Sequence, residues 1–468
     1  MQSELIPTMT TNISTETTAM LRPVDPRVAK FARFEKEAKQ PSWLIPLRKA
    51  GIARFAELGF PTTRNEDWRF TNVAPIAKLP FEPVFDAGAE DVSAAALSEL
   101  TFAKVAGPRL VFVNGRFASD LSTIRTLPDG VKAGSLAAAL VSESVLLEKH
   151  LGRYVRAEDS AFAALNTAFF LDGAFIHVPE GVVVPEPIQM VFISTVKEAG
   201  ATTHPRNLII AEKQSQLTVV EFYVRTVDAP YFTNAVTELI AGEDAVVEHV
   251  KFQDESREAF HIATVHGQFG RRSRVSSHSF ALGARLSRNN IYANLAGEGL
   301  ECILNGLYLT KEEQLADHHM IVEHARPQCA SHEYFNGILD DKSRGVFHGR
   351  ILVRPIAQKT DAKQTNKNIL LSDEATADTK PQLEIYADDV KCTHGATIGQ
   401  LDEDAVYYLR SRGIGLDMAR QMLIHAFAGE IIDRVLCEPV REELDRLVWQ
   451  RLEANPRLAH DESSKLKG

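Results

Sequence analysis

The middle of the chain, from about residue 170 to 400, consists largely of short runs in which apolar and polar residues alternate. Examples are QLTVVEFYV, AVVEHVKF, RVSSHSFAL, LECILNGLYL and GVFHGRILV. Alternation with a period of two and many β-branched residues are typical of β-strands. Apolar residues at helical spacing are nearly absent from this stretch, so the sequence predicts an all-β segment.

The turns that precede several of these runs recur at a steady interval. They lie near Glu212, Glu243, Gly270, Gly297 and Gln328, about 27 to 31 residues apart. A sandwich of hairpins would show turn signals every ~8 to 12 residues, and Asn-Gly or Asp-Gly pairs are scarce here. A longer, steady interval is typical of stacked coils, none of which can bury its apolar face alone. We therefore predict a β-solenoid whose open ends are capped by other structure.

The segment before the solenoid mixes helical and strand patterns. Apolar residues at helical spacing predict two or three helices between residues 25 and 58 and another amphipathic helix over 136–151. Between them, the dipeptide Asn114-Gly115 separates two short apolar runs, which predicts a β-hairpin. We assign residues 1–22, which are rich in Thr and Ser, to a disordered tail and 23–155 to a mixed α/β region.

After the solenoid, which we assign to residues 156–400, helical patterns return. Asp402 is positioned to cap a first helix that ends at Gly413, and Asp417 to cap a second. Met418 and Met422 lie on one face of that second helix, which we expect to dock on other structure. The region 401–468 is thus predicted to be a small helical unit, too short to build its own core.

Composition and charge narrow the classes of function. The chain has 468 residues, a net charge of −10 and hydrophobic residues at 44%, which is the profile of an ordinary soluble protein. An acidic chain argues against nucleic acid or an anionic membrane as the main partner. The first basic residue is Arg22, and no apolar run approaches the ~18 residues of a membrane helix, so we expect a cytoplasmic protein.

Several catalytic motifs are missing from the sequence. It contains no G-x-x-x-x-G-K-[ST], H-E-x-x-H or G-x-S-x-G, so we expect this chain neither to bind nucleotide through a P-loop nor to be an enzyme of those classes. The four cysteines lie far apart without a C-x-x-C pair: Cys302, Cys329, Cys392 and Cys437. That spacing favours free thiols over a disulfide framework or a zinc ribbon.

Two stretches hold residues that could bind metal. DHHMIVEHARPQCASHE, residues 317–333, is rich in histidine, but His318 and His319 would point to opposite faces of a strand. We interpret this stretch mainly as polar ladder positions on a sheet surface, with a ligand role as the alternative. Cys392 and His394 instead share one face, about 7 Å apart. They could form half of a metal site, or a nucleophile with its base, or have only a structural role.

Longer stretches around these positions carry a family resemblance. DDVKCTHGATIGQLDEDAVYYLRSRGI (388–414) and RNEDWRFTN (64–72) resemble the C-terminal and N-terminal signatures of the SufB/SufD family of iron–sulfur cluster assembly proteins. Residues 332–372 and NTAFFLDGAFIHVPEGV (166–182) fit as well, so the resemblance extends from about residue 25 to 455. Gly395 and the following Ala-Thr-Ile-Gly, where SufB-like chains tend to have an acidic residue and Thr-Thr-Ser, favour the SufD branch.

The resemblance implies a right-handed parallel β-helix core between N-terminal and C-terminal helical regions. It also implies a non-catalytic scaffold of the SUF system that supports cluster assembly and iron acquisition. This scaffold would pair with SufB through the end of the β-helix and bind the ABC-type ATPase SufC through its C-terminal helices. Cys392 and His394 would then hold a transient cluster or iron at the SufB interface, and the isolated chain could form a homodimer.

Two other functions remain open from the sequence. A SufB-type primary scaffold would assemble a cluster on this chain alone. A β-helix enzyme acting on acidic carbohydrate would need clustered carboxylates along a groove and export from the cell, and the expected lack of a signal peptide argues against it.

Overall fold

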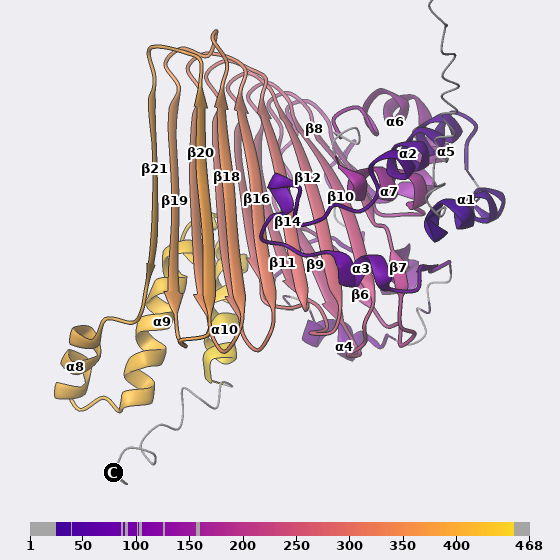
Figure 1. Cartoon of the computed structure of the whole chain (residues 1–468). Coiled ribbons are helices and arrows are strands. Elements are labelled where there is room, and N and C mark those ends of the chain that lie inside the picture. Colours follow the sequence, from indigo (N-terminus) through magenta and orange to yellow (C-terminus); the bar gives the residue numbers. More distant parts are fainter. Residues whose placement is uncertain are drawn as a thin grey trace, which may run out of the picture.

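Parallel strands in two facing sheets form the body of the protein (Figure 1). This computed structural model describes residues 25–453 except 39, 86–87, 89–91, 101, 103–104, 125–126 and 156–159. The predicted disordered tail, residues 1–22, lies outside the described residues.

Successive strands alternate between the two sheets, so that each coil contributes one strand to each. The eleven-stranded sheet runs through β8 (Arg206–Ala211), β10 (Phe232–Ala241), β12 (Phe260–Phe269), β14 (Leu286–Leu295), β16 (Leu315–His324), β18 (Arg344–Val353) and β20 (Thr376–Ile385). The ten-stranded sheet runs through β9 (Gln216–Arg225), β11 (Val246–Asp254), β13 (Arg274–Ala281), β15 (Glu301–Thr310), β17 (Ala330–Leu339), β19 (Asp361–Leu370) and β21 (Lys391–Gly399). The predicted β-solenoid is confirmed.

The strand register explains the interval seen in the sequence. Val246 pairs with Arg274, which pairs with Glu301, then Ala330, then Asp361, so these coils are 28, 27, 29 and 31 residues long. Backbones of adjacent turns touch at Gly297, where a Cβ atom would lie 2.0 Å from the amide nitrogen of Arg271. Only glycine fits such a close approach of two main chains.

Side chains between the sheets form the main core. Alternate residues of each strand point inward, and the resulting apolar cluster extends along the coils, with members such as Val219, Leu239, Val247, Ile291 and Val322. Each coil buries its apolar side chains against those of the neighbouring coils, which a single coil could not do alone.

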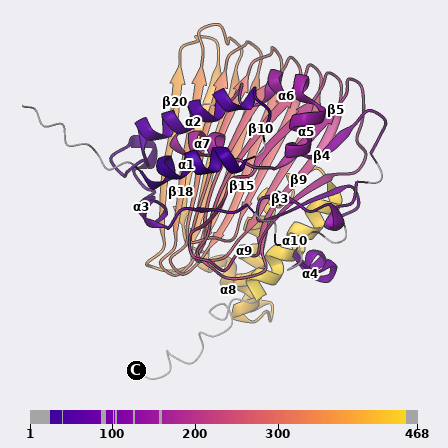
Figure 2. The same cartoon turned by 90° about the vertical axis from the view of Figure 1, so that its right-hand side faces the viewer.

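The N-terminal elements cover one end of the solenoid, which faces the viewer in Figure 2. The helices there are α1 (Pro26–Glu37), α2 (Leu44–Leu58), α5 (Leu136–Ser142), α6 (Ser144–His150) and α7 (Ala161–Phe169). Shorter elements precede and join them: η1 (Glu66–Trp68), α3 (Ala74–Lys78), β1 (Glu82–Pro83), α4 (Ala94–Leu100), η3 (Ser119–Leu121), β4 (Lys132–Ser135), β5 (Ala174–Val178), β6 (Ile188–Ser194) and β7 (Ala201–Thr203).

Two local predictions in this region have different outcomes. The hairpin is confirmed, because β2 (Arg109–Val113) and β3 (Arg116–Phe117) pair antiparallel around Asn114 and Gly115, both at positive φ. The single helix over 136–151 is wrong, because the chain breaks into α5 and α6 at Glu143. Glu143 has φ −124° and its carboxylate lies 2.6 Å from Lys132 Nζ, an ion pair that holds the break against β4.

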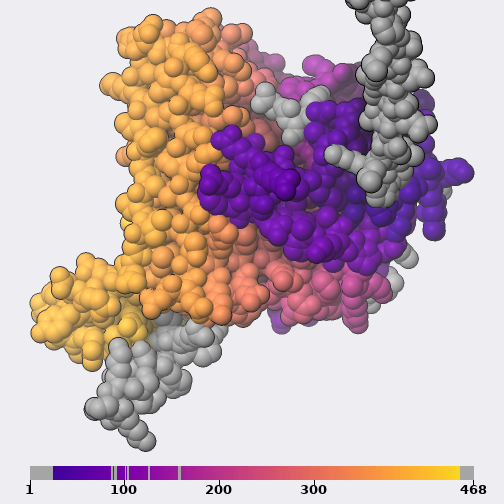
Figure 3. Space-filling model, in the orientation of Figure 1, coloured from indigo at the N-terminus to yellow at the C-terminus, as the bar shows by residue number. Residues whose placement is uncertain are grey.

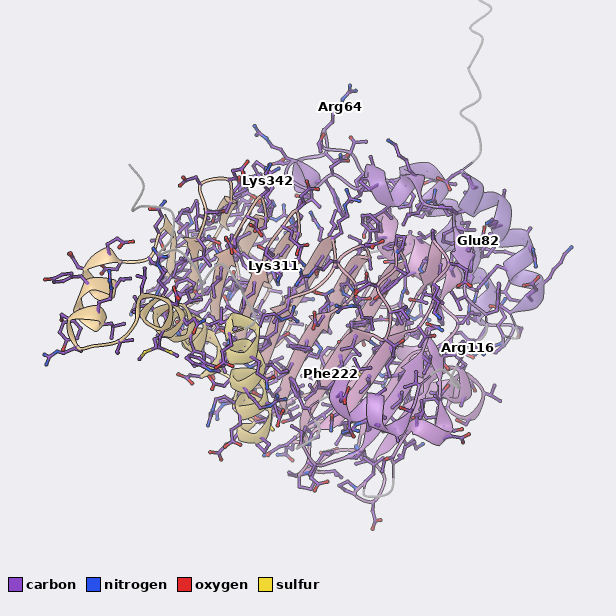
Figure 4. The ribbon with its side chains drawn as sticks, turned by 90° about the horizontal axis from the view of Figure 1, so that it is seen from below. Arg64, Glu82, Arg116, Phe222, Lys311 and Lys342 are labelled. Carbon is purple, nitrogen blue, oxygen red and sulfur yellow. The ribbon has the colours of Figure 1, made fainter. Side chains whose placement is uncertain are left out.

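Two of the three C-terminal helices, α9 (Leu416–Ile432) and α10 (Glu438–Glu453), pack against the outer face of the ten-stranded sheet, and the first, α8 (Glu403–Ser411), packs against α9. Ile424 and Ile431 of α9 share an apolar cluster with Phe222 of β9, which is labelled in Figure 4. The carboxylate of Glu248 accepts hydrogen bonds from the two amides between α9 and α10, at 2.6 and 3.0 Å, and so fixes that turn on the sheet.

Helix caps in this region agree only in part with the predictions. Asp402 caps α8 by accepting from two backbone amides, as predicted. The cap of α9 is Gly415, and Asp417 lies within the first turn instead, where its charge favours the positive end of the helix. The C-terminal region docks on the solenoid as expected, but Met418 and Met422 lie off the face that packs there and are 44% and 39% exposed.

Candidate functional site

The strand that carries Cys392 and His394 is the last of the solenoid. β21 ends the ten-stranded sheet, and within the part of the chain that the structure describes β19 is its one sheet neighbour. It lies at the end of the stack opposite α1 and α2 (Figure 1). The other edge of β21 therefore presents a row of backbone donors and acceptors that no described strand pairs.

Both residues face the interior of the last coil. Cys392 is half-buried and packs on a small cluster that includes Ile351 and Ala362, whereas His394 is exposed. In register, Ala362 lies beside Cys392 and Gln364 lies beside His394. The structure thus places the thiol and the imidazole on one face, as the i, i+2 spacing predicts.

The thiol of Cys392 is not activated within this chain. Burial and the nearby carboxylate of Asp361 raise its pKa above the ordinary value. A thiol in such a position is protonated at neutral pH and gains nucleophilicity or metal affinity only when a cation or a partner removes its proton. This electrostatic setting speaks against the pair acting as a nucleophile with its base.

Behind His394, polar side chains continue into the buried interior. Gln364 Nε2 donates to Glu333 Oε2 at 2.5 Å, and Glu333 is the register neighbour of Gln364 one coil further in. Burial raises the pKa of Glu333 to about 7, although the hydrogen bond from Gln364 opposes that rise. The column Glu333, Gln364 and His394 therefore leads from the interior to the open end of the solenoid.

The terminal coil is bare on the side away from β19. A Cβ atom built on Gly395 or Gly399 would meet no atom within 4 Å. Apolar side chains are also exposed at this end, with Ile398 at 48%, Ile385 at 38% and Tyr386 at 61%. Unpaired strand edges with exposed apolar side chains are features of interaction surfaces.

Cys392 and His394 alone make an incomplete ligand set. Within the described ranges, one group of three or more Cys, His, Asp and Glu side chains lies close enough to share an ion, and it consists of other residues. Zinc and iron–sulfur units usually take four protein ligands. Any ion or cluster held here needs further ligands from outside this chain's described residues.

The other three cysteines lie away from the exposed terminal coil. Cys302 is buried in the register column of Cys392, three coils inward, and Cys329 donates its thiol to Gly297 O at 3.2 Å. Cys437 is half-buried in the turn before α10. Burial raises the pKa of all three thiols, as expected of cysteines that serve packing.

The histidine-rich stretch 317–333 does not assemble into one site, and the expected position on a sheet surface is wrong for His318, His319 and His324, which are buried. His318 points inward and stacks on Tyr308 at a centroid distance of 5.3 Å, and His324 lies 2.9 Å from Ser331 Oγ. Burial lowers the pKa of His318 to about 3 and that of His324 to about 4, so both are neutral. His319 points to the opposite face of β16, where it meets two residues that the sequence did not link to it.

A second polar group, inside the middle coils, was not foreseen from the sequence. Glu221 Oε2 lies 2.8 Å from His249 Nε2, and Lys251 Nζ lies 2.9 Å from His261 Nε2. Burial lowers the pKa of Lys251 to about 8, against the attraction of Glu221 and Glu255. Alternation of polar and apolar residues assigns such side chains to the surface, and only the pairing of coils shows them to be internal.

Comparison with known proteins gives a consistent result along the chain. A family model described as the SufBD core domain of SUF system FeS cluster assembly matches residues 192–427, and one described as the SufBD protein N-terminal region matches 31–190.

Among the described residues, no helix is long and apolar enough to cross a membrane.

Individual relatives align over most of their length. An iron–sulfur cluster assembly SufBD family protein of Synechocystis is 35% identical over 84% of this chain and 88% of its own. The iron–sulfur cluster assembly protein SufD of Escherichia coli is 31% identical over 91% and 96%, and that of Bacillus subtilis is 27% identical over 90% and 96%.

Proposed function

Because this chain belongs to the SufBD family of iron–sulfur cluster assembly proteins, we propose that it is a non-catalytic scaffold subunit of the SUF machinery, of the SufD type. In this proposal the chain builds no cluster by itself. It supplies one side of an interface at which a SufB-type subunit assembles the cluster, and iron and sulfide are cargo.

The observation that carries this proposal is the uncovered strand β21. Its free edge offers main-chain hydrogen bonds to a strand of another chain, and such edges in soluble proteins are normally covered or blunted. The strand itself exposes Ile398 for apolar contact. A SufB-type chain with a matching open end would bury both, and the isolated chain could bury them by pairing with itself.

Cys392 and His394 then acquire the ligands they lack. Both point into the mouth of the terminal coil, so a partner docked on β21 would face them. A cation delivered there would favour the thiolate of Cys392, whose pKa is raised in the free chain. We assign His394 as the main ligand of iron or a nascent cluster, because it is exposed, and Cys392 as the second.

The C-terminal helices are proposed as the contact for the ATPase subunit SufC. Their outer surface exposes apolar side chains that the solenoid does not use: Tyr407 at 75%, Tyr408 at 57%, Met418 at 44% and Met422 at 39%. Exposed aromatic and methionine side chains are enriched in protein interfaces. The surface adjoins the C-terminal end of β21, because α8 begins at Glu403, directly after that strand ends at Gly399 (Figure 1).

Coexpression with a SufB-type and a SufC-type chain tests the proposal. We expect a stable complex in which His394→Ala lowers bound iron and acid-labile sulfide while the subunits still copurify. Thr393→Ala is the matched control, because Thr393 is exposed on the opposite face of the same strand. A chain that stays a monomer beside both partners would refute the scaffold role. Full cluster assembly on this chain alone would instead indicate a SufB-type primary scaffold.

A further inference from the structure

A segment of the N-terminal region crosses the outer face of the eleven-stranded sheet. It comprises residues 64–72 and is part of the indigo surface that lies against the later coils in Figure 3. Arg288 Nη1 donates to the carbonyl oxygen of Asp67 at 2.7 Å, and its guanidinium lies 3.7 Å from the ring centroid of Trp68. Thr71 donates to Asp317 Oδ2 at 2.5 Å. These contacts fix the segment over β14 and β16.

Three potential metal ligands meet beneath this segment. His319 of β16 and His348 of β18 are register partners on the outer face, with ring centroids 4.3 Å apart. Asp67 in η1 approaches them from above, its Oδ1 3.9 Å from His319 Nε2. One donor atom from each residue lies within 4.8 Å of the other two.

The hydrogen bonds leave lone pairs available for an ion. His348 Nε2 lies 2.8 Å from Gln382 Oε1, so Nε2 carries the proton and Nδ1 keeps its lone pair. The ring of His319 is buried, and its Nδ1 has no hydrogen-bond partner among the described residues. Its Nε2 is 3.9 Å from Asp67, beyond hydrogen-bond distance. A buried imidazole nitrogen without a hydrogen-bond partner is costly unless a ligand is bound to the ring.

The charges around the site leave one carboxylate unmatched. Arg288 pairs with Asp317 at 2.7 Å, and Lys380 pairs with Glu66 at 2.6 Å. Arg350 pairs with Glu384 at 3.5 Å. The carboxylate of Asp67 lies nearest to the imidazole of His319 instead of a Lys or Arg side chain, so it is the acidic group that could neutralise part of the charge of a bound cation.

We propose that Asp67, His319 and His348 bind one divalent transition-metal ion of the Zn²⁺ class. Two imidazoles and one carboxylate suit Zn²⁺, Co²⁺ or Fe²⁺, whereas Ca²⁺ and Mg²⁺ prefer oxygen ligands alone. Tetrahedral zinc requires donor atoms about 3.3 Å apart, given metal–nitrogen bonds of about 2.0 Å. The side chain of Asp67 is 57% exposed and can rotate to close the difference.

The ion would act as a clasp between the N-terminal segment and the solenoid. Asp67 lies far from the two histidines in sequence, so one bound ion joins the first region of the chain to two successive coils. Gln382 supports the site by fixing the tautomer of His348. This site is separate from Cys392 and His394 and does not depend on the proposed scaffold function.

Titration of the metal-free, full-length chain with Co²⁺ tests the proposal. We expect one equivalent to produce visible absorption of a four-coordinate site and to be displaced by Zn²⁺. Binding at Cys392 would be distinguished by near-ultraviolet thiolate charge-transfer absorption, which a site of two His and one Asp lacks. We also expect Zn²⁺ to raise the thermal midpoint of unfolding, because it binds only the folded chain.

Variants assign the binding to these three residues. Asp67→Asn and His348→Ala should weaken Co²⁺ binding at least tenfold and abolish the thermal shift. Asp445→Asn is the matched control, because Asp445 lies 2.8 Å from His425 in a His–Asp pair that lacks a second imidazole. Asp67 is exposed, so Asp67→Asn should leave the fold intact. No Co²⁺ binding by the unmodified chain, or equal binding by Asp67→Asn, would overturn the proposal.

Discussion

Replacing Glu333 by Gln removes a carboxyl group that is buried in the interior of the solenoid. Its side chain is fully buried, and Gln364 Nε2 donates to it at 2.5 Å. A glutamine at residue 333 keeps an oxygen that can accept this hydrogen bond. The substitution therefore removes the ionisation of the group while changing its shape little.

The pKa of Glu333 gives the expected magnitude. Burial raises it from 4.5 to about 7, a difference of about 2.5, which at 1.36 kcal/mol for each unit of pKa corresponds to about 3 kcal/mol. The folded state favours the protonated form. Below pH 4.5 the carboxyl is protonated in both states and imposes no penalty on folding. As the pH rises through 7, the penalty of about 3 kcal/mol develops in full.

Urea unfolding of the unmodified chain and of Glu333→Gln at pH 5 and pH 8 measures this effect. We expect the free energies of unfolding to differ little at pH 5 and Glu333→Gln to be more stable by about 3 kcal/mol at pH 8. Glu301→Gln, at an exposed position on β15, should follow the unmodified chain at both pH values. Parallel stability curves for the unmodified chain and Glu333→Gln between pH 5 and pH 8 would refute the reasoning.

Three other substitutions test how the coils and helices are held together. Gly297→Ala places a Cβ atom 2.0 Å from the amide nitrogen of Arg271. We expect the free energy of unfolding to fall by at least about 2 kcal/mol, seen as a lower thermal midpoint. An unchanged midpoint would contradict the close stacking of the coils. Arg206→Met breaks a buried ion pair with Glu238 at 2.6 Å and should lower the free energy of unfolding, measured with urea, by about 3–5 kcal/mol. A decrease below about 1 kcal/mol would show that the pair is dispensable. Glu248→Ala removes both hydrogen bonds to the turn between α9 and α10, so the amides of that turn should exchange hydrogen at least tenfold faster, while unchanged exchange would mean that apolar packing alone holds the helices.

The fold could be predicted because its signals are local and repeated. Strand alternation and the interval between turns define the coils, and Asp402 and the Asn114-Gly115 pair act within a few residues of their position. The break at Glu143 was missed because the apolar residues on either side of it keep helical spacing across 136–151. The buried face of α9 was missed because methionines fit both a core and an exposed interaction surface.

Only the part of the candidate site that lies on a single strand could be predicted from the sequence. Cys392 and His394 share a face because the period of a strand is two. Their role as ligands at a partner interface stays a prediction. The column of Glu333 and Gln364 behind them depends on the register between coils, and coil lengths vary from 27 to 31 residues, so the sequence alone does not align it. The meeting of Asp67 with His319 is hidden for a different reason, because it depends on how the N-terminal segment packs over the eleven-stranded sheet.

The most direct test of the central claim is amide hydrogen exchange of β21 with and without a SufB-type partner chain. If the partner pairs with the open edge, the outward-facing amides of residues 391–399 should become protected by at least an order of magnitude, while those of the already paired strand β15 should not change. Unchanged exchange in β21 within a stable complex would contradict the claim that this end of the solenoid is the interface at which Cys392 and His394 act.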